Sequence, residues 1–124
     1  MKIIIDGYNL MYRMELTGTL EQKREELLES LAEFMSVNPN EILVVFDGGR
    51  NPSQHRGAEA KYGIKIFYSA QGETADDYIM EMVEKRKGKA KMHLVVSSDR
   101  KITDFAKKHF MKTMTSDEFV VYFE

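Results

Sequence analysis

Three aspartates stand where apolar runs of this sequence end, and they are its best candidates for chemistry. Asp6 follows a run of three isoleucines, Asp47 directly follows a second apolar run, and Asp99 follows a third after two serines. Continuous β-branched and apolar runs are typical of parallel strands that are covered on both faces. The strand candidates that carry these aspartates are Ile3–Ile5, Ile42–Phe46 and Leu94–Val96.

Asp76 and Asp77 add two carboxylates from another part of the chain. They lie in the segment GETADD at the start of a helix that we expect over Thr74–Lys87. That helix should begin at the edge of the sheet where the strands end, so its carboxylates would face the same crevice. Two unit charges about 4 Å apart repel by about 4 kcal/mol at an effective dielectric near 20. Such a cluster therefore raises its own pKa values or binds cations.

Oxygen atoms are the metal ligands that this sequence offers at that crevice, because it has no cysteine and its histidines are scattered. Mg²⁺ and Mn²⁺ prefer such ligands. One or two of these ions can activate water and stabilise a leaving oxygen. The pattern therefore favours metal-assisted hydrolysis of phosphodiesters.

Each acid also has a purely structural interpretation. Thr74 and Asp77 fit a capping box, which makes Asp76 the better ligand candidate of the two neighbours. The other pairs that can be ordinary turns or helix caps are Asp6-Gly7, Asp47-Gly48 and Ser98-Asp99.

Polar and basic residues near the acids can contact a substrate. Asn9 can cap a turn, or it can hold a phosphate or a water. The loop after Asp47 carries basic side chains that can grip a nucleic-acid backbone or simply be solvated. They are Arg50, His55, Arg56 and Lys61. A further basic run, Lys85–Lys91, most often compensates the charge at a helix C-terminus, and it lies at the opposite end of the expected sheet.

Strands and helices must alternate to position these residues. We expect an α/β three-layer sandwich whose central parallel sheet has the strand order 3-2-1-4-5. The first strand is then central, and the ligand crevice lies outside the strand ends where the chain reverses direction. Besides the three strands above, Ile64–Ser69 is the expected third strand and Met111–Thr115 the fifth.

The sequence predicts two further helices clearly and leaves other segments open. One helix opens with a capping box at Thr19–Gln22 and stops at Asn38-Pro39-Asn40, and another covers Arg100–Phe110. We interpret Tyr8–Gly18 as a loop or irregular turn, and Ser53–Tyr62 can hold a short helix. Ser116–Glu124 can be helix or strand, and the pattern does not decide between them.

Composition bounds the protein class. A chain of 124 residues suggests one domain over 1–124. A net charge of −2 excludes a globally basic nucleic-acid binder but permits a local basic face. The lack of cysteine fits a cytoplasmic location, and no apolar run approaches a membrane span, so we expect no membrane partner. The Gly-rich signatures of P-loop and dinucleotide-binding proteins are absent.

Four motifs together resemble the YacP-like NYN domains of the PIN-like nuclease superfamily, over roughly residues 1–118. They are Ile5–Asn9 (IDGYN), Val45–Asp47 (VFD), Gly72–Asp77 (GETADD) and Ser97–Asp99 (SSD). The resemblance implies a PIN-like sandwich and an Mg²⁺- or Mn²⁺-dependent endoribonuclease. Relatives in this family often continue with a further charged helical region, whereas this sequence stops at Glu124.

The resemblance also implies roles for individual residues. By position, Asp6, Asp76 and Asp99 match the metal-binding acids of the family. Asp47 falls where a further acid can sit. The polar residues around the site match Asn9 and Ser97.

Our hypothesis is therefore a metal-dependent endoribonuclease whose partner is RNA. The residues assigned to catalysis are Asp6, Asp47, Asp76 and Asp99, with Asp77 as a further metal ligand. The residues assigned to substrate binding are Asn9, Ser97, Ser98, Arg50 and Arg56. A ribosome or ribonucleoprotein, and a second copy of the chain, stay open as partners.

Two other classes of function remain open on the same fold. One is a non-catalytic RNA-binding module, although uncompensated carboxylates repel phosphate. The other is a metal-dependent phosphatase. A receiver-like phospho-acceptor lacks the expected pair of acids at the first strand end, where only Asp6 is present.

Overall fold

The computed structural model describes residues 1–48 and 55–123 as alternating strands and helices. None of the helices in these ranges is long and apolar enough to cross a membrane. Along the chain the elements are β1 (Lys2–Asp6), α1 (Gly7–Met11), α2 (Leu20–Val37), β2 (Glu41–Phe46), β3 (Gly57–Lys61), β4 (Ile64–Tyr68), α3 (Ala75–Arg86), η1 (Lys87–Met92), β5 (His93–Val96), α4 (Arg100–Lys108), β6 (Lys112–Met114), α5 (Ser116–Phe119) and η2 (Val120–Phe123).

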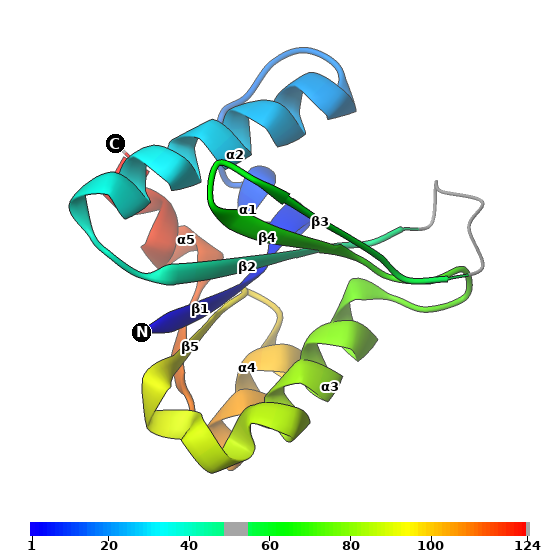
Figure 1. The fold of residues 1–124 in the computed structure, drawn as a ribbon, viewed down its shortest axis with the longest axis vertical. Coiled ribbons are helices and arrows are strands. Elements are labelled where there is room, and N and C mark those ends of the chain that lie inside the picture. Colours follow the sequence, from blue (N-terminus) through cyan, green and yellow to red (C-terminus); the bar gives the residue numbers. More distant parts are fainter. Residues whose placement is uncertain (49–54, 124) are drawn as a thin grey trace.

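One six-stranded sheet runs through the molecule in the order β3-β4-β2-β1-β5-β6. The strands β4, β2, β1, β5 and β6 are parallel, so the expected order 3-2-1-4-5 is confirmed for these five. β1 is central, with β2 on one side and β5 on the other (Figure 1). The C-terminal ends of the parallel strands therefore share one edge of the sheet, where the chain reverses direction.

β3 is an additional edge strand that the sequence pattern did not predict. The helix suggested within Ser53–Tyr62 is wrong in its described part, because Gly57–Lys61 pair antiparallel with β4. Tyr62 and Gly63 connect the two strands with φ angles of 56° and 79°. Two consecutive positive φ values are the mark of a type I′ hairpin turn, whose twist matches that of the strands. Most of β3 is exposed, so it lacks the apolar alternation that identifies a strand.

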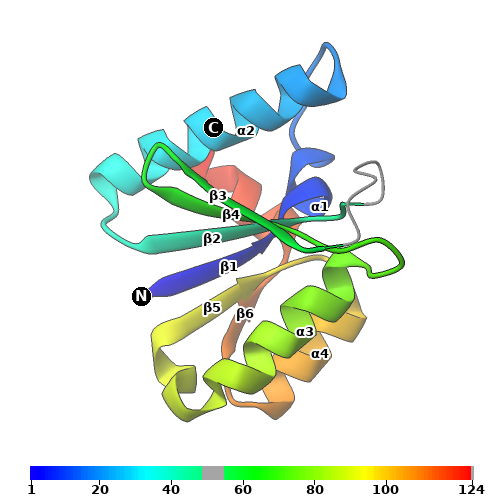
Figure 2. The ribbon, with the colours of Figure 1, turned by 45° about the vertical axis from the view of Figure 1, so that its right-hand side comes forward.

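Helices cover both faces of the sheet (Figures 1 and 2). α1, α2 and α5 lie on one face, and α3 and α4 lie on the other. Ile3 and Ile5 belong to the core on the α2 side, whereas Ile4 belongs to the core on the α3 side. All three are at most 3% exposed. A central strand with two buried faces explains why three β-branched residues follow one another.

Gly7 begins helix α1, so the pair Asp6-Gly7 is not the turn that its residue types suggest. The first part of the expected loop Tyr8–Gly18 is consequently helical. A Cβ atom at Gly7 would lie 2.5 Å from the ring of Phe46 and 2.9 Å from the side chain of Val44. Glycine is needed here because α1 packs directly against β2 as the chain leaves β1.

The segment after β6 is helical in its described part, which settles the choice left open for Ser116–Glu124. α5 begins with a capping box in which Thr115 and Glu118 satisfy each other's backbone amides. Phe119 is 1% exposed, and its ring lies 5.4 Å from that of Phe34 on α2. The last helical turns therefore complete the core on the α2 side.

Candidate functional site

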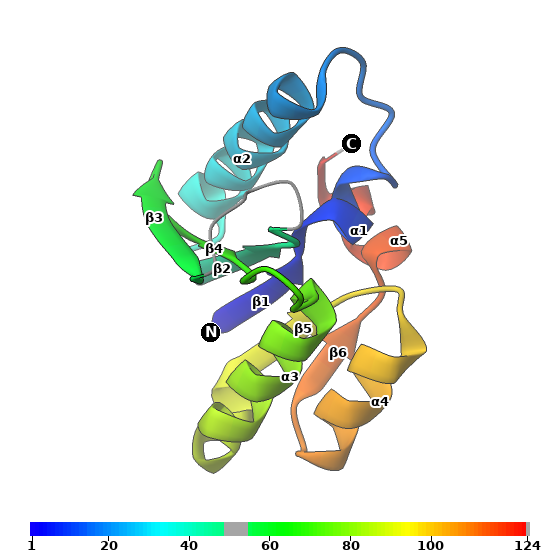
Figure 3. The same cartoon turned by 90° about the vertical axis from the view of Figure 1, so that its right-hand side faces the viewer.

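The end of β1 and the starts of α3 and α4 lie at the C-terminal edge of the sheet (Figure 3), and they carry Asp6, Asp76 and Asp99. Asp6 is the last residue of β1, Asp76 is in the first turn of α3, and Asp99 is the N-cap of α4. β1 and β5 are paired in parallel with Ile5 opposite Val96, so the residues that follow these strands are neighbours. The charges of Asp76 and Asp99 both act on Asp6. The convergence expected from the sheet topology is therefore present for these three acids.

Asp6 is a buried carboxylate, only 7% exposed. Burial raises its pKa from 3.8 to about 6, and the negative charges of Asp76 and Asp99 act in the same direction. The hydroxyl of Ser97 and the backbone of Asn9 oppose this rise in pKa because they stabilise the charged form. Asp6 thus holds its proton far more tightly than an ordinary aspartate does.

Ser97 links two of the acids. It is fully buried, and its Oγ donates a hydrogen bond of 3.0 Å to Oδ2 of Asp6. The same Oγ accepts a hydrogen bond of 3.0 Å from the backbone N–H of Asp99. Oδ1 of Asp99 in turn accepts from the backbone N–H of Lys101 at 2.9 Å, which caps α4. Asp99 therefore caps α4, as its residue type suggested, and its charge also acts on Asp6 and Asp76.

Asp99 is the charged group with the largest effect on Asp76. Burial raises the pKa of Asp76, and the charge of Asp99 and a hydrogen bond between the two carboxyl groups raise it further. The positive charge of Lys101 opposes these effects. A carboxyl group beside a second negative charge and without a counter-ion keeps its proton more readily, which is the direction seen for Asp76.

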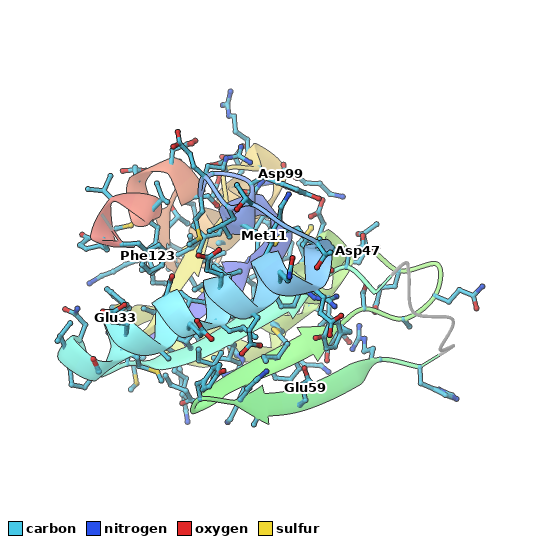
Figure 4. The ribbon with its side chains drawn as sticks, turned by 90° about the horizontal axis from the view of Figure 1, so that it is seen from above. Met11, Glu33, Asp47, Glu59, Asp99 and Phe123 are labelled. Atoms are coloured by element: carbon cyan, nitrogen blue, oxygen red, sulfur yellow. The ribbon has the colours of Figure 1, made fainter. Side chains whose placement is uncertain are left out.

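Asp77 and Asp47 are placed differently from the three clustered acids. Asp77 completes the capping box of α3, because its Oδ2 accepts from the backbone N–H of Thr74 at 3.3 Å while Thr74 caps Asp77 in return. Asp47 is exposed at the end of β2, apart from Asp99 (Figure 4). The charge of Asp77 acts on Asp76 and adds to the rise in its pKa.

Asn9 ties the site together through its side-chain carbonyl. Its Oδ1 accepts from the backbone N–H of Ser98 at 2.9 Å and from the hydroxyl of Ser116 at 2.6 Å. Both lone pairs of this oxygen are therefore occupied, and its Nδ2 donates to none of the described residues. The Nδ2 end of the Asn9 side chain is therefore the part that can still contact a ligand.

Three residues of this network were not identified from the sequence. Ser116 is fully buried, and its backbone N–H donates to Oγ of Ser98 at 3.0 Å. Oγ of Ser98 donates to Asp117 at 3.1 Å, and Asp117 lies 3.5 Å from Nε of Arg13. The only sequence signal was the capping box that starts α5, because nothing local predicts that this helix packs beside Asn9.

The basic residues chosen as substrate contacts have other partners or lie outside the described structure. Arg56 makes two hydrogen bonds with Glu73, at 3.0 and 2.6 Å, and also pairs with Glu81. Its guanidinium carbon lies 3.9 Å from the ring centre of Tyr78. Arg50 lies outside the described residues. Arg56 therefore fastens β3 to α3 in this structure and is not a free cation beside the acids.

The acids fit a hard divalent cation by their chemistry. Oxygen is the ligand atom that Mg²⁺ and Mn²⁺ prefer, and a cation would relieve the repulsion that raises the pKa values of Asp6 and Asp76. Within residues 1–48 and 55–123, however, no three His, Asp or Glu side chains lie close enough together to form a metal cage as they stand. The three acids thus form a region of concentrated negative charge in which the pKa values of Asp6 and Asp76 are raised.

Comparison with known proteins agrees with this fold. The family model described as YacP-like NYN domain matches residues 3–124. A protein of *Bacillus subtilis* (strain 168) named "Uncharacterized protein YacP" is 26% identical over 105 residues. This alignment covers 78% of the present chain and 59% of the relative, so the chain spans little more than half of that protein.

Solved structures show the same architecture. A crystal structure of a mutant form of Rae1 (YacP) from *Bacillus subtilis* superposes with a TM-score of 0.80 at 20% identity, covering 98% of this chain and 74% of that one. A second crystal structure of Rae1 (YacP) gives a TM-score of 0.75 at 20% identity, covering 98% and 72%. At this level of identity the likeness shows the fold.

Proposed function

Because this chain belongs to the YacP-like NYN domain family, a nuclease-type family of the PIN-like superfamily, we propose that it is a metal-dependent endoribonuclease. The observation that carries the proposal is the convergence of Asp6, Asp76 and Asp99 at the C-terminal edge of the sheet. A fold has no need to raise the pKa values of Asp6 and Asp76 by burial and by nearby carboxylates, since a carboxyl group with a raised pKa costs stability when it ionises. A functional site is where such an arrangement is expected.

Asp6, Asp76 and Asp99 are the residues that would hold the ion. When bound, Mg²⁺ or Mn²⁺ supplies a Lewis acid that makes water a better nucleophile and stabilises charge on phosphate oxygens. Ser97 keeps the Asp6 carboxylate in place through its 3.0 Å hydrogen bond. Asp6 must release its proton to act as a ligand. Because its pKa is raised, the proton and the cation would compete for this carboxylate, and cation binding would favour its ionised form.

The reaction is the hydrolysis of an RNA phosphodiester. The oxygen of water forms a new bond to phosphorus, the bond from phosphorus to one ribose oxygen breaks, and that oxygen takes up a proton. The free Nδ2 group of Asn9 can donate to a phosphate oxygen at the edge of the site, since its Oδ1 is already held by Ser98 and Ser116. Asp47 and Asp77 would act from outside this group, on substrate or on a second ion.

The direct experiment compares Asp6→Asn with the unchanged protein and with Asp104→Asn. Asp104 is an exposed residue of α4, so its variant is a matched change of charge away from the site. With Mn²⁺ and a mixture of RNAs, we expect the unchanged protein and Asp104→Asn to cleave. Asp6→Asn should fall to the level of the chelated control while its circular dichroism spectrum stays folded. Full cleavage by Asp6→Asn would remove Asp6 from the mechanism.

A non-catalytic RNA-binding module is the second candidate, and the absence of a ready-made metal cage among the described residues favours it. It predicts RNA binding of equal strength with Mg²⁺ and with chelator, and no cleavage by any variant. The nuclease predicts that cleavage depends on the metal. Turnover of small phosphomonoesters in place of RNA would indicate a metal-dependent phosphatase.

A further inference from the structure

A basic cavity lies at the edge of the sheet opposite to the aspartates. Its volume is about 380 Å³, and its lining residues come from the starts of β1 and β5, the end of α3 and η1. Four of its six lining residues carry a positive charge, and a histidine completes the wall. The lining residues are Lys2, Lys85, Arg86, Gly88, Lys89 and His93.

His93 is buried in this wall with one ring nitrogen unsatisfied. The residue is 1% exposed, and its Nδ1 lies 2.8 Å from the backbone oxygen of Lys89. A carbonyl oxygen can only accept, so Nδ1 carries the hydrogen and Nε2 of the neutral ring has a lone pair. Nε2 is buried and has no hydrogen-bond partner among the described residues. Buried polar atoms of this kind normally have a partner, which points to a missing ligand or proton.

Charged groups on three elements, α3, β1 and β2, act on His93. Burial lowers the pKa of His93, and the positive charges of Arg86 on α3 and Lys2 on β1 lower it further. The Lys89 carbonyl and the charge of Glu41 on β2 oppose this. The ring therefore stays neutral as long as the surrounding positive charge is not balanced.

Some of the cavity's cations already have acidic partners, and others do not. Lys2 lies 3.6 Å from Glu41, and Lys85 lies 3.4 Å from Glu81. Arg86 and Lys89, in contrast, form no ion pair within the described parts of the chain, and Arg86 is only partly exposed. These two side chains and His93 leave the cavity with an excess of positive charge and unused donors.

We propose that this cavity binds one tetrahedral oxyanion, a phosphate group, held by Arg86 and Lys89 and by Nε2 of His93. An Nε2–H donor to the anion requires His93 to take up a proton on binding. The incoming negative charge makes this uptake favourable, because it offsets the nearby cations that now oppose it. Binding of the phosphate group and protonation of the histidine are therefore linked.

The phosphate group can be free or part of an RNA backbone, and the chemistry of recognition is the same. This inference does not depend on the nuclease proposal, because the cavity lies where β1 and β5 begin, whereas Asp6 ends β1 and Asp99 follows the end of β5. Cleavage of a short RNA substrate is therefore a separate measurement, and variants of the cavity should leave it unchanged.

Sulfate is a suitable first probe, because its charge is constant between pH 5.5 and 7.5 at about −2, so any pH dependence belongs to the protein. The three histidines can be followed by NMR and assigned with variants. We expect sulfate to raise the pKa of His93 while the other two histidines change little. Sulfate affinity should increase as the pH falls, with a limit of about tenfold per pH unit for one proton. If sulfate leaves the His93 resonance and pKa unchanged, the proposal is overturned.

Lys89→Gln and Lys91→Gln form a matched pair of exposed positions on η1. Only Lys89 lines the cavity, although both substitutions remove one positive charge. Lys89→Gln should weaken sulfate binding about fivefold more than Lys91→Gln does. Equal effects of the two substitutions would show diffuse attraction to a basic surface and would contradict a built site.

A competition experiment distinguishes a free phosphate ligand from a phosphate group of an RNA backbone. Inorganic phosphate and a short single-stranded RNA are each added to the sulfate-bound protein, and the His93 resonance is followed. Displacement by phosphate alone indicates a free phosphate ligand, and displacement by RNA as well indicates backbone recognition. Displacement by neither contradicts a phosphate site.

Discussion

At the scale of single residues, Asp6 is the most informative side chain of this protein. It ends the central strand, is 7% exposed, and has two further carboxyl groups acting on it. The sequence predicted this position because an apolar run ended in an acid, and topology then placed it beside Asp99. Burial of the carboxylate and the role of Ser97 as its hydrogen-bond donor depend on three-dimensional packing, so they could not be read from spacing alone.

Asp6 should make the metal-free protein less stable as the pH rises. Its folded pKa of about 6 is above its ordinary value of 3.8, so the folded state binds the proton more tightly than the unfolded state. The stabilisation from this proton is complete below pH 3.8 and is lost as the pH rises through about 6. Two pKa units correspond to about 3 kcal/mol.

Comparison with Asp6→Asn isolates this effect, because all other titrating groups are common to the two proteins. Asn keeps an oxygen that can accept from Ser97. In urea denaturation with chelator, the stability of Asp6→Asn relative to the unchanged protein should increase between pH 4 and pH 6.5. A difference that is flat across this range would show that Asp6 is not held in a protonated, buried state.

The basic residues show what residue type leaves open. Arg56 was assigned to substrate because it follows Asp47 in a loop rich in glycine and cations. The structure instead pairs it with Glu73 and Glu81, residues distant in sequence. Charge alone does not say whether a cation has a partner within the fold.

At the scale of elements, the capping boxes and apolar periodicities were reliable guides. The boxes at Thr19 and Thr74 begin α2 and α3 as expected. β3 was missed because its sequence, GAEAK, has no apolar alternation and because the Tyr62-Gly63 turn was not recognised as a hairpin signal. An edge strand is specified by its partner more than by its own residues.

α5 is the element whose contribution to the site was least visible in the sequence. Ser116 fixes its start to α1 and to the loop after β5, through Oδ1 of Asn9 at 2.6 Å and Oγ of Ser98 at 3.0 Å. Ser116 is fully buried, so its hydrogen bonds hold α5 against the site. This helix comes later in the sequence than all four motifs that suggested the site.

Ser116→Ala should therefore lower the free energy of unfolding by about 1–2 kcal/mol, because it removes a buried hydrogen bond to Asn9. Ser36→Ala is a matched control, since the Ser36 hydroxyl donates to Glu33 on the exposed surface of α2. Urea denaturation of both variants measures the difference. Equal stabilities would show that the contact between Ser116 and Asn9 contributes nothing to holding α5.

At the scale of the whole molecule, the sheet topology separates two regions of opposite charge. The parallel strands deliver their C-terminal acids to one edge, and the end of α3 and η1 delivers cations to the other (Figure 2). The strand order was predictable because alternating strands and helices with right-handed crossovers allow few arrangements. The distances among the acids were not predictable, since they depend on how α1, α3 and α4 begin.

The central claim is that Asp6, Asp76 and Asp99 share one divalent ion. Anomalous diffraction from a crystal soaked in Mn²⁺ tests it most directly. We predict a single strong peak between these residues, with carboxylate oxygens at about 2.0–2.2 Å, the distance of a hard octahedral cation. A crystal in which Mn²⁺ binds elsewhere, with the Asp76 and Asp99 carboxyl groups still paired and no peak beside Asp6, would contradict the account.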